Sequence, residues 1–111
     1  MSMILRKWSA NIRTAQVEEY LRYVEETGAG DYRTATGYLA HQILVRDLGE
    51  GISEFSTLSW WTDMDAIKAF AGDLPERARY YPEDDRYLLT RPEEVEHHHV
   101  VSGTHPPNGQ S

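Results

Sequence analysis

The chain has 111 residues, of which 40% are hydrophobic and 26% charged, a composition typical of one small globular domain. Its formal net charge is −7 and its Lys and Arg residues form no cluster, which argues against a nucleic-acid or anionic-membrane partner, because both need a basic surface. The chain has no cysteine, which excludes disulfides, thiolate nucleophiles, iron–sulfur clusters and zinc–thiolate sites.

The first half of the chain predicts a strand, a helix and a hairpin of two strands. Alternating apolar and basic residues predict a strand over residues 3–9. Apolar residues spaced three and four apart predict a helix over residues 14–28, with a threonine as its cap and a glycine at its end. The apolar run 37–46 and the alternating run 52–61 predict two further strands, and the glycine- and acid-rich segment 47–51 predicts the turn between them.

The second half predicts a short helix and a last strand. Thr62 and Asp65 match the capping pattern of a hydroxyl residue followed three positions later by an acid, so a helix is expected directly after the hairpin. Gly72 is expected to end that helix. A second short helix is expected over residues 76–80, and a final strand over residues 95–101.

This order of elements predicts an α+β fold, a ferredoxin-like βαββαβ domain over residues 1–101 with an antiparallel sheet. Residues 102–111 are rich in proline and glycine and are expected to form a disordered tail. Helices on one sheet face leave the other face bare and partly apolar, which predicts a homodimer through that face. Charged residues follow the first few apolar residues of the N-terminus, which does not fit a signal peptide. No apolar run approaches the roughly 20 residues of a membrane span. We therefore expect a cytoplasmic protein without a membrane partner.

Several segments together carry a family resemblance that covers roughly residues 3–101. They are Trp8 and the segments 25–28, 31–33, 55–61, 65–72, 78–85 and 95–97. On these segments the chain resembles the dimeric α+β barrel superfamily that includes antibiotic biosynthesis monooxygenases, and within it a bacterial subgroup. The resemblance implies that two sheets pair into a barrel and that each sheet keeps a pocket between itself and its own helices.

The resemblance also implies two kinds of activity. Some members are cofactor-independent oxygenases of aromatic polyketides, and others degrade haem. The haem-degrading branch uses an Asn on the first strand, a Trp after the third strand and a His on the next helical segment. Trp61 matches that Trp, but Arg6 stands at the Asn position and the segment around Phe70 has no histidine. Haem degradation is therefore not expected, and we expect no cofactor.

Aromatic residues are the candidate walls of the implied pocket. The indole of Trp61 offers a flat apolar surface and one N–H donor, although the residue could instead anchor the core or an interface. Strand alternation places Trp60 on the opposite face. Tyr80 and Tyr81 could close the pocket as a lid or could pack a helix onto the sheet. The candidate substrate-binding residues are Trp8, His41, Trp61, Phe70, Tyr80 and Tyr81.

Arg6 and His97 are the candidate catalytic residues. Arg6 shares a strand face with an indole and could hold an anionic or phenolate oxygen, although it could also pair with a carboxylate. An imidazole at position 97 titrates near neutral pH and could act as a general base, although the histidines at 97–99 could also be structural. His97 and His99 share a face and could bind a metal ion with His41 as a third ligand, but this spacing is nonspecific and no metal is expected.

Two functions are compatible with these residues. The first is a cofactor-independent, monooxygenase-like pocket protein that acts on a small aromatic or conjugated substrate. The alternative is a non-catalytic small-molecule-binding or stress-related dimeric barrel protein. The acidic segment 83–85 lacks the spaced ligands of a calcium loop and is expected to be a solvated turn.

Overall fold

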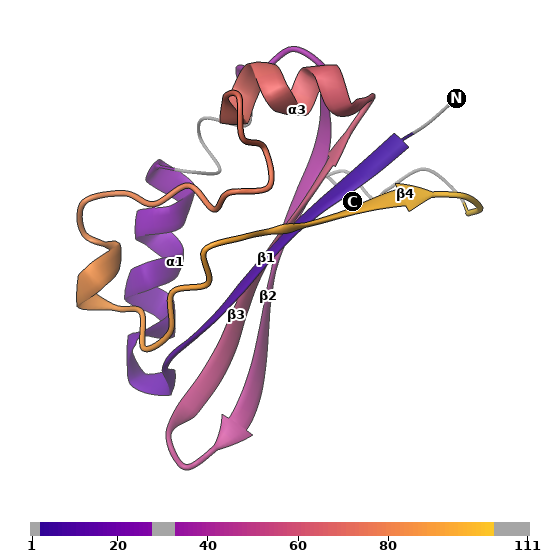
Figure 1. The fold of residues 1–111 in the computed structure, drawn as a ribbon. Helices are drawn as coiled ribbons and strands as arrows, with labels where there is room; N and C mark the ends of the chain where they lie inside the picture. The colour runs from indigo at the N-terminus through magenta and orange to yellow at the C-terminus, as the bar shows by residue number, and fades with distance from the viewer. Residues whose placement is uncertain (1–2, 28–32, 104–111) are drawn as a thin grey trace.

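The computed structural model describes residues 3–27 and 33–103. Four strands form one antiparallel sheet in the order β2-β3-β1-β4, and they are β1 (Met3–Arg13), β2 (Tyr38–Gly49), β3 (Ile52–Trp61) and β4 (Glu96–Val100). Helices α1 (Val17–Glu26) and α3 (Met64–Ala71) lie on the same side of this sheet (Figure 1). Each strand–helix–strand connection crosses over one strand, as in a ferredoxin-like fold, so the predicted fold class is confirmed.

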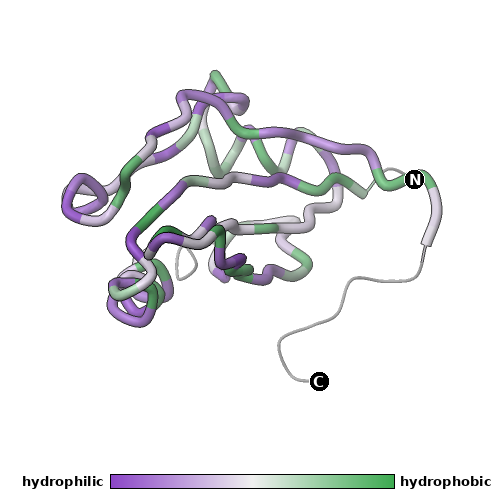
Figure 2. The backbone as a smooth tube through the Cα atoms, turned by 90° about the horizontal axis from the view of Figure 1, so that it is seen from below, coloured by the Kyte–Doolittle hydropathy of each residue, from purple (hydrophilic) through white to green (hydrophobic). Residues whose placement is uncertain are grey.

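The pairing of β1 with β3 decides which side chains face the helices. Ile4 lies opposite Trp61 and Arg6 lies opposite Ser59, and all four side chains are buried on the helix-covered face. Trp60 pairs with Leu5 on the other face, as strand alternation predicts. Hydrophobic and hydrophilic residues alternate along the strands in Figure 2, in keeping with a sheet that has one covered face and one open face.

Two hydrophobic clusters hold the helices to the sheet. One cluster packs α1 against the sheet and is formed by Ile12, Tyr20, Val24, Phe55 and Tyr87. The other packs α3 against the sheet and is formed by Ile4, Trp61 and Ile67. Strand β1 gives one residue to each cluster, and Arg6 and Trp8 lie between these two positions along the strand. Trp8 packs against the first of these clusters, so along β1 the buried Arg6 lies between the two parts of the core.

The hairpin turn is tighter than the sequence predicts. Gly49 pairs with Ile52, so only Glu50 and Gly51 form the loop. Both loop residues have positive φ, 57° and 77°, which is typical of the type I′ turn that matches strand twist. The predicted turn at 47–51 is thus confirmed in place, while β2 continues to Gly49 rather than ending at residue 46.

Both predicted helix caps at hydroxyl residues are wrong. Asp63 rather than Thr62 caps α3, because its Oδ1 accepts a hydrogen bond from the Ala66 amide at 2.8 Å. Thr14 starts the 3-10 helix η1 (Thr14–Gln16), and its hydroxyl instead bonds the Ser53 hydroxyl across the sheet at 2.7 Å. The predicted end of α3 at Gly72 is confirmed by its φ of 94°, whereas the expected end of α1 at residue 28 lies outside the described residues.

The helix predicted over residues 76–80 is absent, which corrects that expectation. Arg77 instead forms an antiparallel bridge with Glu94, and the Ala78 amide donates to the Glu93 carbonyl at 2.8 Å. The carbonyls of Pro75 and Arg77, which a helix would use internally, accept from the Arg6 side chain. Contacts distant in sequence therefore replace the local helical hydrogen bonds.

The segment after α3 contains one regular turn, the 3-10 helix η2 (Asp84–Arg86), and it runs on the same side of the sheet as the helices (Figure 1). Most of the predicted tail, residues 104–111, lies outside the described residues. Within the described ranges, neither helix is long and apolar enough to cross a membrane.

Candidate functional site

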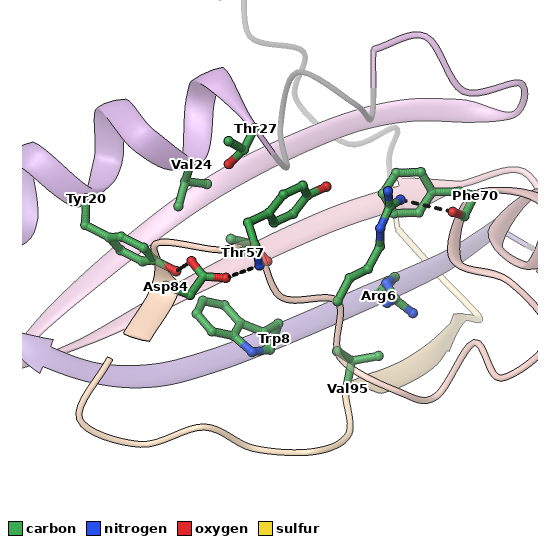
Figure 3. A pocket seen from close by; sticks show the side chains of 11 residues that line it. Arg6, Trp8, Tyr20, Val24, Thr27, Thr57, Phe70, Asp84 and Val95 are labelled. Carbon is green, nitrogen blue, oxygen red and sulfur yellow. Dashed lines mark hydrogen bonds between the residues drawn. The ribbon is translucent and has the colours of Figure 1, made fainter. Parts of the chain in front are cut away.

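A cavity of about 60 Å³ lies between the sheet and the helices. Its walls come from β1, α1, β3 and α3 and from the irregular segment that follows α3 (Figure 3). The lining residues are Arg6, Trp8, Tyr20, Val24, Thr27, Thr57, Phe70, Arg79, Tyr81, Asp84 and Val95. Four predicted site residues, Arg6, Trp8, Phe70 and Tyr81, are therefore brought together around one cavity.

Arg6 is the buried cation of this cavity, with only 5% of its surface exposed. Its Nη1 donates to the Pro75 carbonyl and to Nε2 of His97, the latter at 3.1 Å. Its Nη2 donates to the Arg77 carbonyl at 3.3 Å. These acceptors fix the guanidinium plane and compensate in part for its loss of water. Arg6 therefore presents a positioned positive charge to the cavity.

His97 lies beside Arg6 and is not among the lining residues. Guanidinium nitrogens only donate, so Nε2 of His97 must be the acceptor and the ring proton must be on Nδ1. Burial lowers the pKa of His97 and the charge of Arg6 lowers it further, although Glu76 opposes the change. His97 is thus a neutral imidazole at neutral pH, and the nitrogen on its Arg6 side is already bonded.

Trp8 and Tyr80 form the aromatic pair behind one wall. The indole N–H of Trp8 donates to the Tyr80 hydroxyl at 3.2 Å, and the two rings meet edge to face with centroids 6.2 Å apart. The Tyr80 hydroxyl in turn donates to the Pro92 carbonyl. Burial raises the pKa of Tyr80, so its hydroxyl stays protonated. Trp8 lines the cavity directly, whereas Tyr80 supports it from behind.

Arg79 is a second cation at the cavity, and the sequence did not point to it. Its guanidinium carbon lies 4.7 Å from the centroid of Phe70 and 5.7 Å from that of Tyr81. Its Nη1 also donates to the Phe70 carbonyl at 3.1 Å. Unlike Arg6, this side chain is exposed, so the cavity has one cation inside and one toward solvent.

Asp84 contradicts the expectation of a solvated acidic turn over residues 83–85. The residue is only 4% exposed and lines the cavity. Its Oδ1 accepts from the Tyr20 hydroxyl at 2.9 Å and its Oδ2 accepts from the Tyr81 amide at 2.7 Å (Figure 3). Burial raises the pKa of Tyr20, and the Asp84 charge raises it further, so this hydroxyl remains a donor. Three acids in a row carry no local signal that the middle one is buried.

Trp61 and His41 lie outside the cavity wall. Trp61 is fully buried among the residues that pack α3, and its indole N–H donates to the Ser59 hydroxyl at 2.8 Å. His41 lies on β2, where its Nδ1 shares a hydrogen bond of 2.7 Å with the Tyr38 hydroxyl. Burial lowers the pKa of His41, while Glu25, 3.9 Å away, opposes the change. Both positions are those of packing residues, and their predicted contact with a ligand stays a prediction.

The histidine run is divided by the pairing of β4 with β1. His97 and His99 lie opposite Arg6 and Ile4 on the helix-covered face, while His98 lies opposite Leu5 on the open face and bonds Glu96 at 2.8 Å. Over residues 3–27 and 33–103, no group of three or more His, Cys, Asp or Glu side chains is placed to hold a metal ion.

Known protein structures share the fold of this chain. No family model and no curated protein matches the sequence, but solved structures match the fold over nearly the whole chain. A proposed antibiotic biosynthesis monooxygenase from Bacillus cereus has a TM-score of 0.65 and 15% identity, covering 94% of this chain and 98% of that one. A similarly described protein from Caulobacter crescentus has a TM-score of 0.59 and 15% identity, covering 93% and 92%.

A third similar structure is SnoaB, a cofactor-independent oxygenase from Streptomyces nogalater. It has a TM-score of 0.53 and 14% identity, and the match covers 97% of this chain and 100% of that one. Sequence identities this low are informative about the fold and not about the chemistry. The chain therefore shares its fold with these solved structures, two of which are described as antibiotic biosynthesis monooxygenases.

Proposed function

We propose that this chain is a cofactor-independent, monooxygenase-like protein that binds a small aromatic or conjugated substrate in the cavity between its sheet and its helices. The observation that carries the proposal is a buried, positioned guanidinium beside aromatic walls, with a second guanidinium toward solvent. Flat rings can stack on Trp8, Phe70 and Tyr81, and Arg6 and Arg79 can stabilise negative charge on a ring oxygen.

The proposed chemistry converts an activated CH₂ group and dioxygen into a ketone and water. Loss of a proton from the substrate leaves an electron-rich anion, which transfers electrons to dioxygen and forms the new C–O bond. The resulting hydroperoxide loses water, as its O–O bond and the second C–H bond break, and gives the ketone. In this scheme the two guanidinium groups favour the anion, and we assign His97 to holding Arg6 in place rather than to taking the proton.

The test uses dithranol (1,8-dihydroxyanthrone) as the substrate. We expect the protein to accelerate quinone formation and oxygen consumption above the rate in buffer alone, as measured by absorbance and an oxygen electrode. Arg79→Gln is expected to lower kcat/KM by roughly 10- to 100-fold, since a charged hydrogen bond to the developing anion is lost. Arg46→Gln is the matched control, because Arg46 pairs with Glu54 on the hairpin, away from the cavity.

Binding without reaction would point to the alternative function. Saturable binding of dithranol with oxygen consumption no faster than in buffer would reject the oxygenase and favour a non-catalytic small-molecule-binding protein. Oxygen consumption that Arg79→Gln leaves unchanged would reject the role of that guanidinium.

We also propose that two chains associate through the open face of the sheet. This face carries Leu5, Leu58 and Trp60, which are only partly covered, and Leu44, which is 46% exposed. Apolar side chains gathered on one sheet face favour a self-complementary contact with a second copy. Such a dimer would leave the cavity on the helix-covered side of each chain.

A further inference from the structure

The proposed reaction needs a proton acceptor, and the described lining residues contain one suitable group. They comprise two arginines, apolar and aromatic residues, hydroxyl residues and the Asp84 carboxylate. Guanidinium groups cannot accept a proton, and neutral hydroxyls and indoles are weak bases. His97 lies behind Arg6, and the imidazole nitrogen that faces Arg6 is engaged in a hydrogen bond.

We propose that Asp84 is the proton acceptor of the cavity and that the substrate is a weak carbon or oxygen acid whose proton Asp84 takes. This inference rests on the proposed function, which supplies the need for an anion. It assigns a catalytic role to a residue that the sequence suggested would be exposed to solvent.

The hydrogen bonds of Asp84 suit this role. A carboxylate can accept about four hydrogen bonds, and the Tyr20 hydroxyl and the Tyr81 amide occupy one position on each oxygen. Capacity to accept a proton therefore remains on a side chain whose orientation is fixed from two directions. Because Asp84 is only 4% exposed, little water competes with a bound substrate for its carboxylate.

The proton-transfer step is balanced within the cavity. The C–H or O–H bond of the substrate breaks, the proton moves to an Asp84 oxygen, and the electron pair stays on the substrate as an enolate or phenolate. The total charge of the cavity and substrate is unchanged, with the negative charge now nearer the guanidinium groups of Arg6 and Arg79. Dioxygen, the oxidant of the proposed reaction, then accepts electrons from this anion, and the proton on Asp84 can return to the peroxide oxygen.

Ionisation can be measured separately from oxidation by excluding oxygen. Under anaerobic conditions dithranol is titrated with protein, and its absorbance reports the longer-wavelength anion, while equilibrium dialysis gives the Kd. We expect the wild-type protein to bind dithranol as the anion. We expect Asp84→Asn to bind dithranol with a Kd within about threefold but in its neutral form, and to oxidise it at least about 100-fold more slowly in air.

The matched control is Asp85→Asn, because Asp85 is the adjacent acid, is exposed and pairs with Arg91 outside the cavity. This variant is expected to ionise and oxidise dithranol as the wild-type protein does. If Asp84→Asn does not fold, the wild-type protein still provides a test. Infrared difference spectra with ¹³C-labelled aspartate should then show a protonated carboxyl band on anaerobic binding.

The outcomes separate this inference from the proposed function. Anion formation in Asp84→Asn equal to that of the wild type, or no protonated carboxyl band in the wild type, would overturn the role of Asp84 while leaving the oxygenase intact. Anion formation that depends on Asp84 without oxygen consumption would support the inference and reject the oxygenase. No binding of dithranol by the wild-type protein would reject both for this substrate class.

Discussion

The Nη1 atom of Arg6 donates a hydrogen bond to Nε2 of His97 across adjacent strands at 3.1 Å. Because a guanidinium keeps its protons at all physiological pH values, this bond exists only while the imidazole is neutral. Arg6 also binds the carbonyls of Pro75 and Arg77, so the same side chain ties β4 and the segment after α3 to β1. Protonation of one histidine therefore weakens a contact shared by three parts of the chain.

The stability of the protein is expected to fall as the pH drops below about 6.5. The folded state lowers the pKa of His97 below its ordinary value of about 6.5, so between the two pKa values the unfolded chain binds more protons. Stability consequently rises with pH in this range. The contribution of neutral His97 to the unfolding free energy is fully present above about pH 6.5. Free energies of unfolding from urea titrations at pH 5.0, 6.0 and 7.5 measure the effect.

His97→Gln is expected to reduce this pH dependence, because its amide oxygen can accept from Arg6 without titrating. A weaker dependence of the unfolding free energy on pH should remain, since burial also lowers the pKa of His41. His99→Gln, on the same strand and exposed, is the control and should keep the wild-type slope. An unchanged slope in His97→Gln would show that the Arg6 contact is not the source.

Trp61 is expected to govern stability more than binding. It is fully buried and packs with Ile4 and Ile67, so Trp61→Ala should cost about 3–5 kcal/mol of unfolding free energy and Trp61→Phe less. Chemical denaturation measures this loss. The affinity of Trp61→Phe for dithranol should stay within about threefold of the wild type, and a large loss of affinity at unchanged stability would instead make Trp61 a ligand contact.

Trp8 is expected to report ligand binding by its fluorescence. Of the three tryptophans, only Trp8 lines the described cavity, so a stacked ligand should quench it most. Trp8→Phe should lose more than half of the quenching amplitude, whereas Trp60→Phe, on the open face, should retain it. Equal quenching in both variants would place the ligand elsewhere.

Gly37 is expected to tolerate no side chain. Its φ is +86°, and an added Cβ would lie 2.5 Å from the Ala66 Cβ and 2.8 Å from the Thr62 hydroxyl. Gly37→Ala should therefore cost about 2–5 kcal/mol, from backbone strain together with overpacking. Gly49→Ala is the matched control, since its φ of +89° is similar but nothing lies within 4 Å of the added Cβ. If urea denaturation shows the same loss of unfolding free energy for Gly37→Ala and Gly49→Ala, the close approach of Gly37 to α3 does not add to the cost.

The open sheet face is expected to mediate dimerisation. Wild-type protein should sediment with twice the mass of one chain, and Leu58→Asp should shift it toward the monomer, because a buried unpaired carboxylate is costly. Leu74→Asp is the control, since Leu74 is 53% exposed and lies in the segment after α3. A monomeric wild-type protein at micromolar concentration would reject the proposed dimer.

Regular elements were predictable where the pattern of side chains is local. The third predicted strand, residues 52–61, agrees with β3, and the predicted face of Trp60 agrees with its pairing. The helix predicted over residues 76–80 does not form. The Arg6 side chain, 69 or more positions away in sequence, instead donates hydrogen bonds to carbonyls that this helix would need. No local pattern contains that information.

Arg6 and part of the aromatic lining of the site were predictable from the sequence, whereas Arg79 and Asp84 were not. Trp8, Phe70 and Tyr81 follow from strand alternation, the short helix and the resemblance, and they do line the cavity. Asp84 is buried because Tyr20 on α1, 64 positions earlier, donates to it. Such pairing depends on the tertiary arrangement, so an acidic triplet gives no indication of which member faces inward.

The irregular segment between α3 and β4 gives the cavity Arg79, Tyr81, Asp84 and Val95, whereas the sheet gives it Arg6, Trp8 and Thr57. Substitutions in an irregular segment disturb few ladder hydrogen bonds, so one wall can change while the strands remain as they are. Descendants of this chain could thus acquire new ligand preferences by drift within the single stretch 72–95. Divergence of specificity in this lineage is then expected to concentrate there, and mutational libraries aimed at new substrates should begin with this stretch.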